Sequence, residues 1–136
     1  MRVPEGAVAV ELTVPFHDVD GLHIVWHGHY VKYLEIARME LLRRLGLDIP
    51  QIRELGFRML IAESHLRHVS PLFYGDRFRV SAWLAEIEAR IDTEYEVFNL
   101  TTGRRAATAR SVLVTTTAEG KLCIGTPGPI LERLRP

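Results

Sequence analysis

The sequence predicts an α+β domain in which one long helix packs against an antiparallel sheet. Two observations indicate this class. Residues 30–45 carry apolar side chains at a helical period, and after Gly56 several segments alternate apolar and polar residues between short turns. Short turns join antiparallel neighbours, and one apolar helix on such a sheet gives a layered α+β arrangement. A chain of 136 residues has the length of one domain, so we expect residues 1–136 to form a single domain.

The first predicted element is a strand over residues 7–16. Its apolar residues fall on every second position, which is the pattern of a strand with one buried face. They are Val8, Val10, Leu12, Val14 and Phe16. The segment that follows, up to residue 29, has no clean period and is expected to be a structured loop.

The helix predicted over residues 30–45 has an apolar stripe and a charged side. Glu35 and Arg38 belong to the charged side, and Gly46 is the expected stop. A second, short helix is expected to open at Ile49–Pro50 and to end before Gly56. The stripe comprises Tyr30, Leu34, Ala37, Leu41 and Leu45, widened by Tyr33, Ile36 and Leu42.

The rest of the chain is expected to form strands. They cover residues 58–69, 78–84, 91–97 and 105–117, followed by a short strand at 121–124 and a helix at 130–135. His65 and His68 alternate with Leu66 along the first of them and are expected to be ordinary sheet residues. Because one helix covers only one face of such a sheet, we expect the chain to form oligomers.

Composition narrows the classes of function. Seventeen basic residues balance seventeen acidic ones, whereas a nucleic-acid-binding protein normally has a basic excess. The single cysteine, Cys123, excludes an intramolecular disulfide and fits a reducing compartment. No apolar run reaches the length of a membrane span, and the first residues lack the order of a secretory signal. We therefore expect a cytoplasmic protein without a membrane span or a nucleic-acid partner.

The loop before the long helix carries the candidate chemistry. The free backbone N–H groups of a helix start can polarise a carbonyl group and stabilise an oxyanion. Asp20, followed by Gly21, is placed to act there as a general base or a nucleophile. Four histidines also fall within thirteen residues of this loop: His17, His23, His27 and His29.

The same segment resembles the signature of the hotdog-fold acyl-CoA thioesterases, in particular the 4-hydroxybenzoyl-CoA thioesterase family and its Tol-Pal-associated relatives. The stretch IAESHLRHVSPLFYGDRFRV further resembles that family's second strand, its proline-containing turn and the start of its third strand. The resemblance therefore covers nearly the whole chain. The residues that match the signature are Phe16, Asp18, Asp20, Ile24, Val25, Trp26, His27 and Tyr30.

The resemblance implies a hotdog fold, in which a five- or six-stranded antiparallel sheet wraps around the long helix. It implies a homodimer or homotetramer with the active site between subunits. The implied reaction is hydrolysis of an acyl thioester of coenzyme A or acyl carrier protein, without metal or other cofactor. Asp20 would be the nucleophile or general base, with the helix start near His27 polarising the carbonyl, while Asp18 supports the turn. His27 is the second catalytic candidate, and the substrate-binding candidates are Trp26, Tyr30, Glu35 and His23.

Two positions depart from the family pattern. His23 stands where relatives often have glycine, which affects how closely a thioester can approach the backbone. His29 replaces the usual asparagine, which affects the hydrogen bonds that hold the loop.

Two alternatives remain. The chain could be a hotdog protein without hydrolytic activity, either dehydratase-like with histidine as the base or a binder of acyl thioesters. It could also be a cupin-like metal protein that uses His27, His29 and Glu35 as ligands. A cupin needs those ligands on jelly-roll strands, yet the segment after His29 has a helical period.

Overall fold

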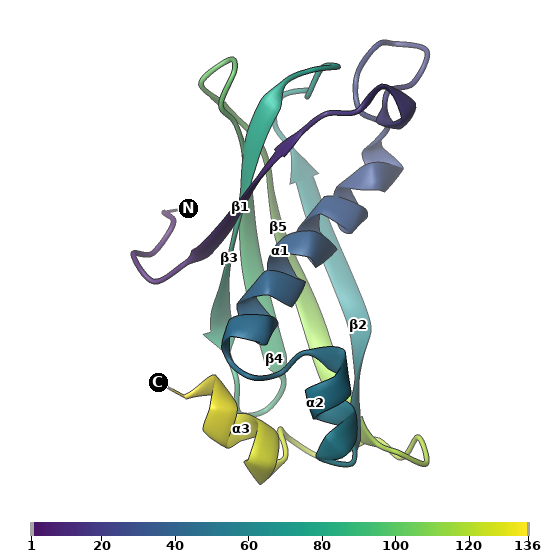
Figure 1. Ribbon diagram of the computed structural model, residues 1–136, viewed down its shortest axis with the longest axis vertical. Coiled ribbons are helices and arrows are strands. Elements are labelled where there is room, and N and C mark those ends of the chain that lie inside the picture. The colour runs from purple at the N-terminus through teal and green to yellow at the C-terminus, as the bar shows by residue number, and fades with distance from the viewer. Residues whose placement is uncertain (1, 136) are drawn as a thin grey trace.

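The computed structural model describes residues 2–135 and contains one five-stranded sheet. Each pair of neighbouring strands is antiparallel, in the order β1-β3-β4-β5-β2. Helix α1 (Tyr30–Arg44) lies across one face of this sheet (Figure 1). This confirms the predicted hotdog architecture. The strands are β1 (Val8–Thr13), β2 (Phe57–His68), β3 (Arg77–Glu86), β4 (Ile91–Asn99) and β5 (Arg104–Thr117).

Helix α1 buries most of the predicted stripe, including Tyr33, Leu34 and Ala37. Two positions on it differ from the prediction. Ile36 is 41% exposed, so it does not widen the buried stripe. Arg38, expected on the charged side, is only 8% exposed, because its stem lies against the sheet and its Nη1 donates to the Tyr95 hydroxyl (3.4 Å).

The core has two parts. One apolar cluster lies between the first half of α1 and the sheet and includes Tyr33, Leu34, Phe78 and Tyr95. The other lies beneath α2 (Ile49–Glu54) and α3 (Gly128–Leu134), at the end of the molecule opposite the loop before α1 (Figure 1). It contains Leu42, Leu47, Ile52, Ile91, Leu113, Ile130 and Leu134. None of the helices within residues 2–135 has the length and apolar character needed to cross a bilayer.

The strand expected at residues 121–124 does not form. After the turn at Gly120 the chain makes one isolated bridge, between Leu122 and Thr116, and then leaves the sheet. Ile124 is fully exposed, so this segment has no buried face to hold a longer ladder. The sheet therefore has five strands.

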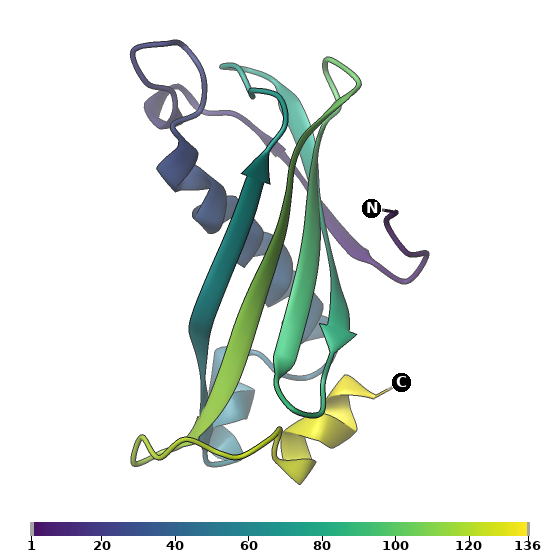
Figure 2. The ribbon, with the colours of Figure 1, turned by 180° about the vertical axis from the view of Figure 1, so that it is seen from behind.

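Strand β2 is an open edge of the sheet. Figure 2 shows it at one side of the sheet, where β5 is its only neighbour among residues 2–135, and no helix of that range covers the second face of the sheet. Its register with β5 shifts between Ile61 and Glu63, which marks a bulge at Ala62. Leu60 and Ile61 are 53% and 44% exposed. An edge with exposed apolar residues is the kind of edge that another strand can cover.

Candidate active site

The loop before α1 folds into a compact turn around Asp20. The backbone N–H of Asp20 donates to the carbonyl of Ile24 (2.9 Å), and the N–H of His23 donates to the carbonyl of Asp20 (2.9 Å). His23 has a φ of 65°, which is the left-handed conformation that favours glycine. The tight turn therefore keeps the shape that a glycine would allow, at the cost of backbone strain at His23.

The turn also fixes the Asp20 carboxylate. Its Oδ1 accepts a hydrogen bond from the backbone N–H of Leu22 (2.8 Å), which is an Asx-turn. Within residues 2–135 the second oxygen, Oδ2, has no hydrogen-bond donor. One oxygen thus sets the orientation of the group, and the other is available to a water molecule or a substrate.

Asp20 lines a cavity of about 390 Å³ at the start of α1. Its volume lies within the range of small-molecule sites in proteins. One wall comes from the loop before α1, and the other comes from the end of β2 and the residues after it. The structure thereby brings together three residues singled out from the sequence, Asp20, His27 and Tyr30. The complete lining is Asp20, Leu22, Ile24, Val25, His27, Tyr30, His68, Val69, Ser70 and Pro71.

The helix that opens at this cavity begins with a single turn, η2 (His27–His29), which runs directly into α1. The carbonyl of Trp26 accepts the N–H of His29 (3.0 Å). The first N–H groups of a helix have no partner inside the helix, which here applies to those of His27 and Gly28. Such groups favour negative charge, so an oxyanion that develops in the cavity would be stabilised by them.

Gly28 leaves room for an aromatic ring at the helix start. A Cβ atom at this position would overlap the ring of Trp26 as it lies here, which covers the glycine and also contacts the rings of His27 and His29. Trp26 is 48% exposed and does not line the cavity. The glycine therefore lets an indole ring cover the helix start from outside.

Asp18 is a buried support for the loop, as expected. Both oxygens of its carboxylate accept from Lys32 Nζ (2.9 and 3.0 Å), and Oδ2 also accepts from the Tyr33 hydroxyl. Its carbonyl accepts the N–H of Trp26 (3.0 Å). Burial acts to raise the pKa of Asp18, but the hydrogen bonds from Tyr33 and Lys32 outweigh it and hold the pKa below its ordinary value. Asp18 is therefore a carboxylate that fastens the loop to the first turn of α1.

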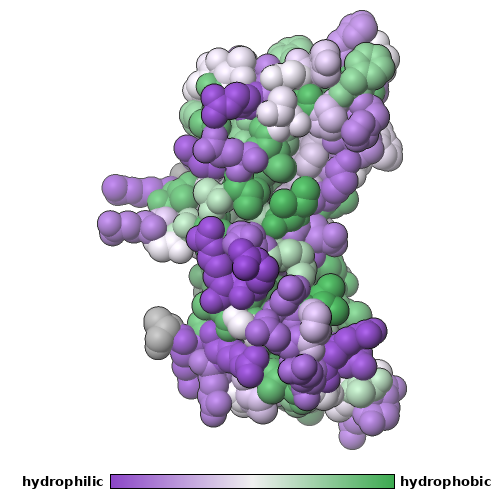
Figure 3. Space-filling view, in the orientation of Figure 1, coloured by the Kyte–Doolittle hydropathy of each residue, from purple (hydrophilic) through white to green (hydrophobic). Residues whose placement is uncertain are grey.

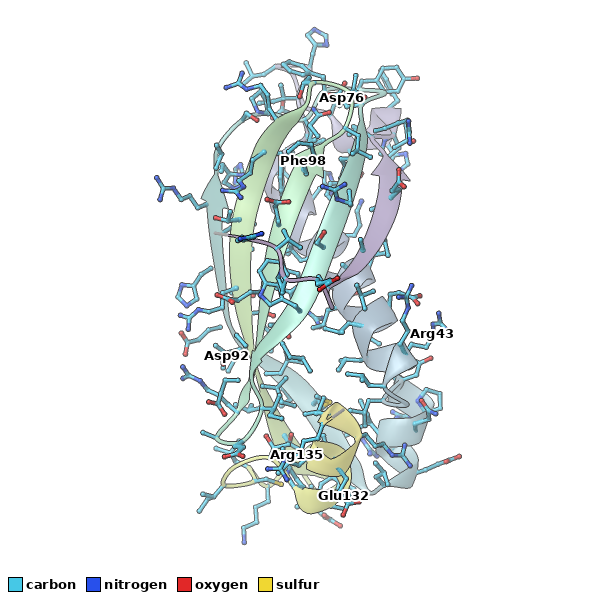
Figure 4. The ribbon with its side chains drawn as sticks, turned by 90° about the vertical axis from the view of Figure 1, so that its left-hand side faces the viewer. Arg43, Asp76, Asp92, Phe98, Glu132 and Arg135 are labelled. Carbon is cyan, nitrogen blue, oxygen red and sulfur yellow. The ribbon has the colours of Figure 1, made fainter. Side chains whose placement is uncertain are left out.

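The wall formed by the end of β2 is anchored independently. The Asp76 carboxylate accepts from Asn99 Nδ2 (2.7 Å) and from the backbone N–H of Phe73 (2.9 Å), which ties the connection between β2 and β3 to β4. Figure 4 shows Asp76 at one end of the sheet, far from Glu132 and Arg135 of the opposite end. Both walls of the cavity are therefore held by a buried aspartate, Asp18 on one side and Asp76 on the other.

His68 lines the cavity, although from its alternation along β2 it was expected to be an ordinary sheet residue. Its ring packs edge-on against the ring of Tyr30, with 4.7 Å between centroids. Burial raises the pKa of Tyr30 to about 12, and the backbone of Leu72 acts in the opposite direction. Alternation along β2 predicts which face His68 lies on, but no local signal predicts that this face meets the loop of Asp20.

The other candidates lie elsewhere. His23 is exposed at the tip of the turn, and Glu35 is 66% exposed on α1, 3.6 Å from Arg38 Nη2. Neither lines the cavity of Asp20. The cupin-like alternative is wrong, because a helix rather than a jelly-roll strand follows His29 and the fold has one sheet. Among the described residues no group of three or more His, Cys, Asp or Glu side chains could hold a metal ion.

Comparisons with known proteins agree with this geometry. The model of a family described as the thioesterase-like superfamily matches residues 14–134. An Aquifex aeolicus protein, whose esterase activity is itself only proposed, is 31% identical over 90% of this chain and 93% of its own. A chloroplast acyl-acyl carrier protein thioesterase of Arabidopsis thaliana is 28% identical over 77% of this chain and 56% of its own. The crystal structure of a 1,4-dihydroxy-2-naphthoyl-CoA thioesterase from Synechocystis superposes with a TM-score of 0.82, at 22% identity, over 95% of this chain and 96% of that one.

Proposed function

The chain belongs to the thioesterase-like superfamily, and we propose that it hydrolyses an acyl thioester to a free acid and a thiol. The thiol would be coenzyme A or the prosthetic group of an acyl carrier protein, since proteins similar to this chain are described as acting on each. The observation that carries the proposal is the cavity in which the Asp20 carboxylate and the start of a helix face the same space.

Each group has a part in the reaction. The N–H groups at the start of η2 would polarise the thioester carbonyl, and Asp20 would supply the electron pair. Asp20 either attacks the carbonyl carbon, to form a mixed anhydride, or takes a proton from a water molecule that attacks instead. His27, on the same wall, would position the water or the acyl group. A single turnover in heavy-oxygen water tests the nucleophilic route, because the Asp20 carboxylate takes up label only when a mixed anhydride forms and water then attacks its aspartyl carbon.

Replacing Asp20 by Asn tests the assignment. Asparagine also forms Asx-turns, so the loop should keep its shape while the base is lost. We expect hydrolysis of acyl-CoA to fall by at least about a hundredfold, the scale of a lost general base, with unchanged thermal unfolding. Asp48→Asn is the matched control, since Asp48 caps α2 at the far end of the molecule and asparagine caps helices equally well. Near-normal turnover by Asp20→Asn would refute the assignment, and an altered acyl chain without thiol release would point to a dehydratase-like reaction instead.

The open edge supports a second part of the proposal, a homodimer formed through β2. Hydrophobic side chains reach the surface between α1 and β2 (Figure 3). A cavity of about 470 Å³ lies there, lined by apolar residues such as Met39, Leu42 and Met59 from α1 and β2. A second copy that pairs its own β2 with this edge would cover both the strand and the groove. The subunit interface would then run alongside the cavity of Asp20, and two such dimers could form a tetramer.

A further inference from the structure

The two walls of the Asp20 cavity differ in the proton chemistry they offer. The loop wall carries the Asp20 carboxylate and His27. On the β2 wall, the cavity-lining residues are His68, Val69, Ser70 and Pro71, and His68 is the one imidazole among these described residues. The carboxylate and this imidazole therefore come from different walls of the same cavity.

We propose that His68 is the acid that protonates the sulfur of the departing thiol. The proposal rests on the hydrolysis proposed above and adds a catalytic residue to it. In a displacement at a carbonyl carbon, attack and departure involve different sides of the tetrahedral carbon. A base on one wall and an acid on the other fit that requirement.

The position of His68 is well defined by its neighbours. Directly after it, the backbone N–H groups of Val69 and Ser70 both donate to the carbonyl of Ala106 (2.8 and 3.1 Å). The His68 ring meets the edge of the Tyr30 ring, and Tyr30 is 3% exposed at the start of α1. A side chain fixed by its own strand and by a buried ring can present a proton at a constant place.

Other groups in the cavity are less suited to this step. The Ser70 hydroxyl donates to the carbonyl of Arg105 (2.6 Å), so its proton is already used. The pKa of Tyr30 is raised to about 12, so its hydroxyl gives up a proton less readily than an ordinary tyrosine. His27 lies on the wall of Asp20, beside the N–H groups that would hold the carbonyl oxygen. Histidine is the side chain that exchanges protons most readily near neutral pH.

The step balances on either route. When water attacks, Asp20 takes one proton from the water as the C–O bond forms, and His68 in its imidazolium form gives one proton to sulfur as the C–S bond breaks. The products are the carboxylic acid and the thiol, and the proton on Asp20 returns to His68 through solvent. When Asp20 attacks, the proton transfer from His68 accompanies formation of the anhydride, and hydrolysis of the anhydride restores both groups.

The test compares leaving groups. For His68→Gln we expect hydrolysis of an acyl-CoA to fall about a hundredfold, the low end for general acid catalysis because a thiolate already leaves well. The same acyl group on nitrothiophenol should react within a few-fold of the unmodified protein, since that thiolate needs no proton. His65→Gln is the matched control, because His65 lies on the same strand outside the cavity and contacts Glu63 (3.0 Å). It should leave both rates unchanged.

A second variant distinguishes two roles of His68, donating a proton and filling space against Tyr30. His68→Phe keeps a ring against Tyr30 but carries no proton, so it should lose the acyl-CoA rate as His68→Gln does. Rescue by phenylalanine, or an equal loss on both leaving groups, would overturn the proposal, as would unchanged hydrolysis of acyl-CoA by His68→Gln. Failure of the underlying function has a different signature, namely an unmodified protein that hydrolyses no thioester or an Asp20→Asn variant that remains active.

Discussion

Replacing Asp18 by Asn should destabilise the protein without touching the reacting atoms. Two donors depend on this carboxylate, the Lys32 ammonium and the Tyr33 hydroxyl. Lys32 is 46% exposed, and an ion pair of that kind contributes about 0.5–1 kcal/mol. Tyr33 is 3% exposed, so its hydroxyl would lose a charged acceptor inside the core, at a cost of about 1.5–3 kcal/mol. Together these losses lower the free energy of unfolding by about 3 kcal/mol, or roughly 10 °C in Tm.

The loss of stability caused by Asp18→Asn should depend on pH. The pKa of Asp18 in the folded protein lies below the ordinary value of an aspartate, so the ionised carboxylate stabilises the fold at pH values above that ordinary pKa. The stabilisation is lost as the pH falls through the folded-state pKa, where Asp18 becomes protonated in both states. The gap between the unmodified protein and Asp18→Asn should therefore stay constant from neutral pH to about pH 5 and close at lower pH.

Urea unfolding followed by circular dichroism measures both quantities. Lys32→Met is the informative companion, because it removes the exposed donor and keeps the buried one, and should cost less than about 1 kcal/mol. The reasoning fails if Asp18→Asn unfolds within about 0.5 kcal/mol of the unmodified protein, or if Lys32→Met costs as much as Asp18→Asn. A gap that persists unchanged at acid pH would contradict the assignment of the effect to charge.

Two further variants examine the turn and the edge. His23→Gly should raise the free energy of unfolding by about 0.5–1 kcal/mol in urea titrations, because glycine adopts a φ of 65° without strain, whereas Leu22→Gly beside it should not. Ile61→Lys places a charge on the open edge of β2 and should yield monomers in analytical ultracentrifugation. Ile124→Lys, at a fully exposed position away from that edge, should not change the mass. A dimer that survives Ile61→Lys would argue against assembly through β2.

Periodicity in the sequence was sufficient to predict the α+β class, because burial on one face of a helix or strand imposes that periodicity, whereas the hotdog arrangement was implied by the family resemblance. The helical stripe of α1 and five of the six predicted strands appear in the structure. Residues 121–124 did not follow the prediction, since a short alternating segment needs a buried face and Ile124 has none. Arg38 is the converse case, where a charged side chain lies on the buried side and its guanidinium donates to the Tyr95 hydroxyl.

The sequence predicted which residues of the candidate site lie together only where they are close along the chain. Asp20, His27 and Tyr30 lie within eleven positions and share one cavity. His68 belongs to the same cavity, but it arrives there through the pairing of β2 with β5 and the packing of α1, which no local pattern encodes. The backbone strain at His23 was not predicted either. The sequence showed only that histidine stands where relatives often have glycine, not that its φ would be positive.

The division of the core into two apolar clusters has a consequence for how this chain can change. The cluster under α2 and α3 contains no residue of the Asp20 cavity. Those of its side chains that do not line the cavity between α1 and β2, such as Leu47, Ile130 and Leu134, can therefore be repacked to alter thermal tolerance with little effect on the chemistry proposed at the other end. The cluster around Tyr30 and Tyr33 cannot be repacked in the same way, because the rings that fill the core there also support the Asp20 cavity. The end of the molecule under α2 and α3 can therefore vary in stability, whereas the end with the Asp20 cavity is constrained by the hydrolysis that we propose there.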